Sequence, residues 1–167
     1  FNVYEPCTVT FNANGGSGTM EDIIVKKDGA YKLPECDFTA PTNTGFYKWK
    51  INGTLYNAGE EVEISDNTVL YATWYVKEVR KRVTEPTIGA MPDNTMTDDT
   101  VVINGEPVKF EDHTVVQNSF YDTTEPFVAN KSYVFTGMLS MTSADSGKLY
   151  YTDDTKFYLN SELIKPT

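Results

Sequence analysis

Short runs of alternating apolar and polar residues, separated by Asn-Gly and Asp-Gly dipeptides, dominate this chain of 167 residues. Asn14-Gly15 opens a longer glycine-rich turn, and the three other such dipeptides are Asp28-Gly29, Asn52-Gly53 and Asn104-Gly105. They favour two-residue hairpin turns, whose central positions need positive φ. Aromatic residues make up 13% of the chain, and aromatic and β-branched side chains pack well on a pleated surface. The pattern predicts a mainly β fold.

The first half is predicted to consist of strands whose apolar residues recur with a period of two. Val9, Phe11 and Ala13 share one face of an opening strand, which runs into a glycine-rich turn. Leu70, Ala72 and Trp74 are expected on the inward face of the closing strand. Residues 35–44 leave two alternatives open, a short helix or an irregular crossover. The remaining predicted strands of this half are 23–25, 31–33, 46–51 and 62–64.

A shift in composition near Tyr75 predicts two domains, at 1–77 and 78–167, which join near residue 77. The basic run Val76–Val83 alternates valines with charges, which indicates a solvated first strand of the second domain rather than a nucleic-acid-binding stripe. The second domain is predicted to be an antiparallel β-sandwich, because it contains at least six short strands at regular spacing. These strands are roughly 78–85, 100–104, 107–111, 114–120, 132–141 and 155–160.

The charge of the chain argues against two classes of partner. Its formal net charge is −10, whereas nucleic acids and anionic membranes attract basic surfaces. No run of about eighteen apolar residues occurs, so we expect no membrane insertion in this segment. The chain starts at Phe1 rather than Met, and we expect it to be a segment of a longer protein.

Reactive side chains form no recognisable catalytic pattern. His113, the only histidine, follows Glu111 and Asp112 without a nucleophile motif, and we expect a solvated loop histidine. The neighbouring carboxylates Asp98 and Asp99 would point to opposite sides of a strand. Loop aspartates provide oxygen ligands suited to Ca²⁺, but the EF-hand spacing is absent. We therefore predict no enzymatic activity, no cofactor and no metal site, with calcium in the acidic loops as the open alternative.

Two kinds of cross-link are conceivable. Cys7 and Cys36 either form a disulfide, which would contribute about 3 kcal/mol by loop-closure entropy, or remain two unpaired thiols. The sequence leaves both alternatives open, because it does not give the Cα separation. An internal isopeptide bond would need Lys81 or Lys131 buried beside Asn160 and a carboxylate. No sequence signature predicts this bond.

Aromatic residues are the remaining candidates for a binding site. Tyr121, Tyr150 and Tyr151 are candidate ligand-binding residues, because the apolar faces of sugars stack on exposed rings with polar groups nearby. The alternative, which we favour for Tyr121 and Tyr150, is that alternating aromatic residues fill two small cores.

Residues 8–74 resemble the Listeria–Bacteroides repeat of Gram-positive surface proteins, similar to the B repeat of internalin B. The resemblance rests on the strand–glycine turn Thr8–Gly16, the closing strand Thr68–Trp74 and the turn Tyr56-Asn57-Ala58-Gly59. It implies a β-grasp-like domain with one short helix. It also implies that Trp49 and Trp74 are core residues. Cys36 departs from the family, which has a polar residue at that position.

Residues 127–135 and 154–160 resemble the immunoglobulin-like modules that follow such repeats. Together the resemblances imply a non-catalytic module of a cell-surface or secreted bacterial protein, acting as a spacer, an adhesion domain or a protein-interaction domain. The partner would be an unknown protein or glycan, and the location the surface or wall of a Gram-positive bacterium. The alternative function is a carbohydrate-binding module attached to a secreted glycan-active enzyme.

Overall fold

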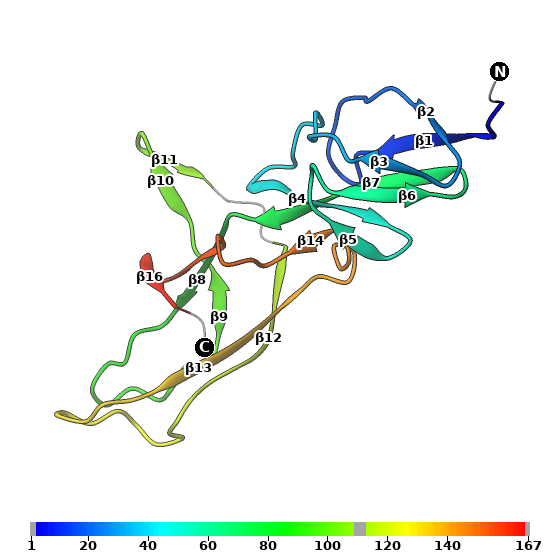
Figure 1. Ribbon diagram of the computed structural model, residues 1–167. Helices are drawn as coiled ribbons and strands as arrows, with labels where there is room; N and C mark the ends of the chain where they lie inside the picture. Colours follow the sequence, from blue (N-terminus) through cyan, green and yellow to red (C-terminus); the bar gives the residue numbers. More distant parts are fainter. Residues whose placement is uncertain (1–2, 109–112, 166–167) are drawn as a thin grey trace. The chain divides into compact units, whose positions relative to one another are not determined.

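The computed structural model describes residues 3–108 and 113–165, and all regular structure in these ranges is β-strand (Figure 1). This confirms the mainly β prediction. The chain divides into two compact units. The first unit comprises Phe1–Val76 and Gly147–Thr152, and the second comprises Lys77–Ser146 and Asp153–Thr167. A short piece from the second half of the sequence therefore belongs to the first unit.

The first unit is built on a mixed sheet in the order β2-β1-β7-β4-β5, with β14 also paired to β7. β1 and β14 both run parallel to β7, and each pairs with a different part of it. β3 and β6 form a separate antiparallel pair. The strands are β1 (Pro6–Asn12), β2 (Ile23–Lys26), β3 (Gly29–Lys32), β4 (Thr44–Ile51), β5 (Thr54–Tyr56), β6 (Glu61–Ile64), β7 (Thr68–Val76) and β14 (Leu149–Tyr150).

Two tryptophans form the centre of the first core. Trp49 and Trp74 are 0% and 1% exposed, which confirms that they are core residues. Phe46 contacts both rings, with centroid distances of 5.2 Å to Trp49 and 6.1 Å to Trp74. Each indole N–H donates to the backbone, that of Trp49 to Pro34 O at 2.8 Å and that of Trp74 to Ala13 O at 3.2 Å. The predicted inward face of β7 is likewise buried.

The short helix implied by the resemblance is absent from residues 35–44, and the irregular-crossover alternative describes this segment. Thr39 forms an isolated antiparallel bridge with Ser17, and the two residues exchange backbone hydrogen bonds of 2.8 and 2.9 Å. Pro41 has no N–H for a helical ladder and disfavours helical φ/ψ at the residue before it. These local preferences oppose a helix at Ala40 and Pro41.

The second unit contains a four-stranded sheet in the order β16-β15-β8-β9 and two separate two-stranded ribbons, β10–β11 and β12–β13. β8 and β15 are parallel, so this sheet is mixed rather than purely antiparallel as predicted. The sequence did not predict β5, β9, β14 or β16. The strands are β8 (Glu78–Val83), β9 (Met96–Asp98), β10 (Val101–Ile103), β11 (Glu106–Val108), β12 (Thr114–Tyr121), β13 (Phe135–Met141), β15 (Lys156–Leu159) and β16 (Glu162–Ile164).

Two of the three predicted hairpin turns are confirmed. Asn52-Gly53 joins β4 to β5 and Asn104-Gly105 joins β10 to β11, with positive φ at all four residues. The hairpin prediction for Asp28-Gly29 is wrong. This turn joins β2 to β3, but β2 pairs with β1 whereas β3 pairs with β6. The dipeptide forms a turn, but the strands on either side of it belong to different sheets. β2 lies in the main sheet of the first unit, and β3 lies in the separate β3–β6 pair.

Candidate functional site

The three tyrosines predicted to bind a ligand lie in different environments. Tyr121 is 7% exposed at the end of β12, and its ring makes edge contacts with Phe127 and Phe135 at centroid distances of 5.1 and 4.9 Å. Its hydroxyl donates to Thr84 O at 2.5 Å. Tyr121 therefore lies in the core of the second unit. Tyr150 lies on β14 of the first unit, and Tyr151 follows it and is half-buried.

A group of tyrosines lies on the side of the first sheet that faces away from the tryptophan core. β7 alternates, so Tyr71 and Tyr75 point away from the side on which Trp74 is buried. Tyr150 is the register partner of Tyr75, and Tyr47 contacts the Tyr150 ring. We name Tyr47, Tyr71, Tyr75 and Tyr150 the tyrosine face. Of this set, the sequence predicted only Tyr150 as a binding residue. The alternation of β7 is the signal for two others, because it places Tyr71 and Tyr75 opposite Leu70, Ala72 and Trp74.

Close packing fixes three rings of the tyrosine face, those of Tyr47, Tyr75 and Tyr150, whereas Tyr71 is 38% exposed. The Tyr47 and Tyr150 centroids are 5.3 Å apart, with the ring planes inclined by 42°. Tyr75 lies against Gly45, where a Cβ atom would approach Cε1 of the Tyr75 ring to 2.5 Å. Burial raises the pKa of the Tyr150 hydroxyl, and the neighbouring Tyr47 raises it further. The hydroxyl therefore stays protonated at neutral pH, and it donates to Gly147 O at 3.4 Å.

Basic side chains border the tyrosine face. Lys48 Nζ lies 5.3 Å from the centroid of the Tyr47 ring. Lys50 Nζ donates to Gly147 O at 2.5 Å, next to the hydroxyl of Tyr150, which lies 3.4 Å from the same oxygen. Rings, hydroxyls and ammonium groups together offer stacking surfaces and hydrogen-bond donors. This combination is suited to non-covalent recognition.

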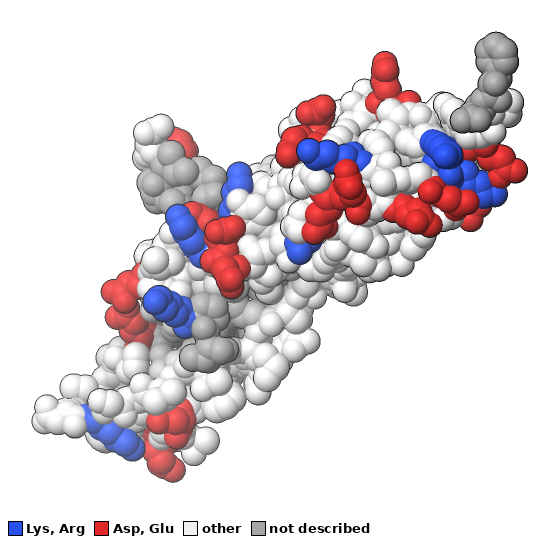
Figure 2. Space-filling model, in the orientation of Figure 1, with Lys and Arg blue, Asp and Glu red and all other residues white. Residues whose placement is uncertain are grey.

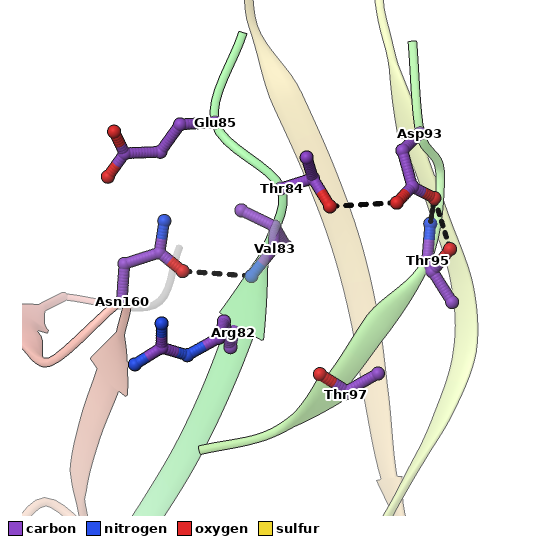
Figure 3. A pocket seen from close by; sticks show the side chains of 8 residues that line it. All are labelled: Arg82, Val83, Thr84, Glu85, Asp93, Thr95, Thr97 and Asn160. Atoms are coloured by element: carbon purple, nitrogen blue, oxygen red, sulfur yellow. Dashed lines mark hydrogen bonds between the residues drawn. The ribbon is translucent and has the colours of Figure 1, made fainter. Parts of the chain in front are cut away.

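A polar hollow of about 530 Å³ lies in the second unit (Figure 3). Asp93 Oδ2 accepts from the Thr84 hydroxyl at 2.7 Å, and Asp93 Oδ1 accepts from the backbone N–H and hydroxyl of Thr95. These bonds lower the pKa of Asp93, with the Thr95 side chain making the largest contribution. Asn160 Oδ1 accepts from Val83 N at 2.8 Å. Several polar groups that line the hollow are thus held in place by hydrogen bonds to one another.

Asp99 is a buried carboxylate that accepts hydrogen bonds from several polar groups, including Arg82, which also lines this hollow. Its Oδ1 accepts from Arg82 Nε and Nη2 at 3.1 and 2.9 Å and from Thr100 N at 2.9 Å. Its Oδ2 accepts from Ser161 Oγ at 2.8 Å. Burial alone would raise the pKa of Asp99, but the hydrogen bonds from Ser161 and Arg82 outweigh this effect and hold the pKa below its ordinary value.

Lys81 is buried with its ammonium group satisfied. Lys81 Nζ donates to Asp98 Oδ1 at 2.7 Å, across the β8–β9 pair, and to Thr114 O at 3.2 Å. Lys131, by contrast, is exposed, with Nζ 5.2 Å from the Tyr133 ring centroid. Asn160, the residue considered for an isopeptide bond, uses its side-chain oxygen to fix the backbone of β8.

His113 is buried rather than solvated, so the expectation of a solvated loop histidine is wrong. It is 9% exposed, and its Nδ1 lies 3.0 Å from Asp145 Oδ2. The Thr142 hydroxyl donates to the same carboxylate oxygen at 2.5 Å. His113 Nε2 is buried without a hydrogen-bond partner in the described part of the chain. Glu111 and Asp112, which suggested a solvated position, lie outside the described residues.

Cys7 and Cys36 are both free thiols in the structure. Cys7 is buried on β1, and Cys36 is half-buried in the irregular segment. Burial raises the pKa of the Cys36 thiol, which keeps it protonated and weakly nucleophilic at neutral pH. Within residues 3–108 and 113–165, no three His, Cys, Asp or Glu side chains are grouped as metal ligands.

On the face drawn in Figure 2, Lys and Arg side chains lie among Asp and Glu side chains. The described ranges also contain no helix long and apolar enough to cross a membrane. Comparisons with protein-family models, with curated proteins and with solved structures found no match to this chain.

Proposed function

We propose that this chain is a non-catalytic module of a bacterial cell-surface or secreted protein, where it serves as a spacer and presents a surface for adhesion or protein interaction. Its expected location is the surface or wall of a Gram-positive bacterium. The supporting observation is the path of the chain between its two β units. Gly147–Thr152 lies between two parts of the second unit in sequence but belongs to the first unit, where it contributes strand β14. Three covalent crossings join the units, so tension on the chain is not carried by a single linker.

The strand order supports a β-grasp-like first unit. In that fold the first and last strands pair in parallel at the centre of the sheet, and each is flanked by an antiparallel partner. β1 and β7 occupy these central positions, with β2 and β4 outside them. For the second unit we propose an immunoglobulin-like arrangement. Tyr121 supports it, because this residue of the β12–β13 ribbon binds Thr84 O, next to the end of β8 in the four-stranded sheet.

The buried polar side chains support a structural assignment. Lys81, Asp99 and His113 each bind groups that lie far away in the sequence. Such contacts hold strands and loops in place. A catalytic group would instead be directed at a substrate pocket.

A binding screen paired with an activity screen tests this proposal. Immobilised chain should bind a surface or matrix protein saturably, or bind none and act purely as a spacer. In parallel, the chain is incubated with glycoside, ester and peptide substrates, and we expect no turnover above buffer. Turnover that disappears in His113→Ala or Asp99→Asn, while the far-UV spectrum is retained, would overturn the non-catalytic proposal.

A second candidate function is carbohydrate binding, favoured by the packed Tyr47 and Tyr150 rings of the tyrosine face. Two inclined rings with hydroxyls and neighbouring ammonium groups are suited to stack on a sugar and donate to its oxygens.

A glycan array separates the two functions. Under the carbohydrate proposal, Tyr150→Ala or Tyr47→Ala should weaken glycan binding at least tenfold. Tyr4→Ala serves as the matched control, because Tyr4 is 54% exposed and lies outside the tyrosine face. An array without hits, or equal weakening by the control, counts against carbohydrate binding.

A further inference from the structure

Residues 147–152 connect two parts of the second unit but form part of the first. The chain leaves the second unit after Ser146 and returns to it at Asp153. Within the first unit this segment supplies β14, which extends the sheet beyond the end of β1 along β7. The first unit is therefore completed by a strand whose two ends are both attached to the second.

The segment makes several contacts in the first unit. Trp74 N donates to Lys148 O at 2.9 Å, and Leu149 is 6% exposed. Tyr150 packs on Tyr47, and Lys50 Nζ donates to Gly147 O. Apolar burial, ring packing and hydrogen bonds all favour the docked state.

Both ends of the segment are fixed inside the second unit. Before it, Ser146 N donates to Thr142 O at 3.0 Å, and Asp145 binds His113 and the Thr142 hydroxyl. After it, Thr155 is buried and Lys156 N donates to Lys77 O at 2.9 Å. A folded second unit thus holds the ends of a six-residue segment. If that unit unfolds, docking β14 must close a long flexible loop from Val76, which is entropically unfavourable.

We propose that the segment Gly147–Thr152 couples the folding of the two units, so that the first unit reaches full stability only when the second is folded. This inference goes beyond the proposed function and does not depend on it. The coupling is reciprocal by thermodynamic linkage, so loss of β14 docking also destabilises the second unit.

The chain provides its own optical probe for this coupling. Its two tryptophans, Trp49 and Trp74, both belong to the first unit. Intrinsic tryptophan fluorescence therefore follows unfolding of the first unit, while amide hydrogen exchange of β12 and β13 follows the second.

The decisive experiment perturbs the second unit and observes the first, in the full chain. Phe127→Ala removes a ring that is 4% exposed in the second core. We expect it to lower the tryptophan-reported unfolding midpoint by about 5 °C or more, together with loss of amide protection in β12 and β13. In the Leu149→Ala background, the same Phe127→Ala change should shift the tryptophan midpoint by less than half as much.

Each remaining outcome also decides the question. If Phe127→Ala abolishes folding of the second unit, coupling predicts a red-shifted tryptophan spectrum at 20 °C, and a native spectrum refutes it. An unchanged tryptophan midpoint beside reduced β12 and β13 protection likewise refutes coupling. Val69→Ala is the matched control, because Val69 lies on β7 but is 38% exposed, and it should leave both probes unchanged.

Discussion

The two units bury different kinds of side chain. Among the described residues of the first unit, the buried polar side chains are two threonines, Thr44 and Thr73, beside a core centred on tryptophan. Those of the second unit, among the described residues, are Lys81, Asp99, His113, Thr114 and Thr155. An apolar core depends mainly on buried area, whereas a polar core depends on every buried group keeping its partner. The stability of the first unit should therefore fall most when side-chain volume is removed from its core. The stability of the second unit should fall most when a buried charge is removed or the pH is changed.

The largest effect is expected from removing volume in the first core. Trp74→Ala should destabilise the first unit by about 3–5 kcal/mol, because Trp74 is 1% exposed and contacts Phe46. Chemical denaturation followed by the fluorescence of the remaining Trp49 measures this loss. Trp74→Phe retains a ring and should lose less. Equal losses for the two variants would show that ring volume is not the deciding factor.

A smaller effect is expected from removing one charge in the second unit. Asp99→Asn keeps the size of the side chain but weakens the bonds from Arg82 and Ser161, and should cost about 1–3 kcal/mol. Amide exchange of β8 and β15 measures the change. Asp153→Asn, at an exposed position, is the control. If Asp99→Asn lowered amide protection no more than this control, buried charge would not distinguish the stability of the second unit from that of the first.

The pH dependence of the same residue provides a third test. The pKa of Asp99 is depressed in the folded chain, so its stabilisation is present above the unfolded carboxyl pKa of about 3.9 and is lost as pH falls through the lower folded pKa. The stability difference between the unmodified chain and Asp99→Asn should therefore shrink as the pH falls from 6 to 2. A difference that stays constant over this range would contradict the assignment.

The smallest effect is expected at the surface of the first unit. Lys27 and Glu5 form an ion pair of 2.6 Å whose side chains are 40% and 74% exposed. Solvent screens such a pair, so Glu5→Gln should leave the thermal midpoint unchanged within error. A clear drop would mean that charge pairs matter in both units, and the contrast between them would weaken.

Local sequence patterns predicted much of this fold. The period of two located β1, β7 and the inward residues Leu70, Ala72 and Trp74, because strand faces depend on residues only two positions apart. The turns at Asn52-Gly53 and Asn104-Gly105 were predictable because positive φ is a local preference. Such features require no knowledge of distant partners.

Three features that the sequence did not predict, β14, the burial of His113 and the tyrosine face, depend on distant partners. β14 is a strand of only two residues, Leu149 and Tyr150. Nothing in these two residues indicates that the strand pairs with β7. His113 was expected in solvent because the preceding residues are acidic, yet it is buried, with Nδ1 3.0 Å from Asp145 Oδ2 and its carbonyl oxygen accepting from Thr142 N. The tyrosine face has the same origin, since Tyr150 meets Tyr47 only after β14 has docked.

The placement of residues 147–152 in the first unit has a consequence for how the gene for this chain can be divided. A gene cut at residue 77 would yield one product with the end of β7 uncovered and another carrying the strand that belongs there. Uncovered strand edges invite pairing with other chains, which favours aggregation. A duplication that preserves both folds must therefore copy the two units together, although the change in composition near Tyr75 indicates two separate domains.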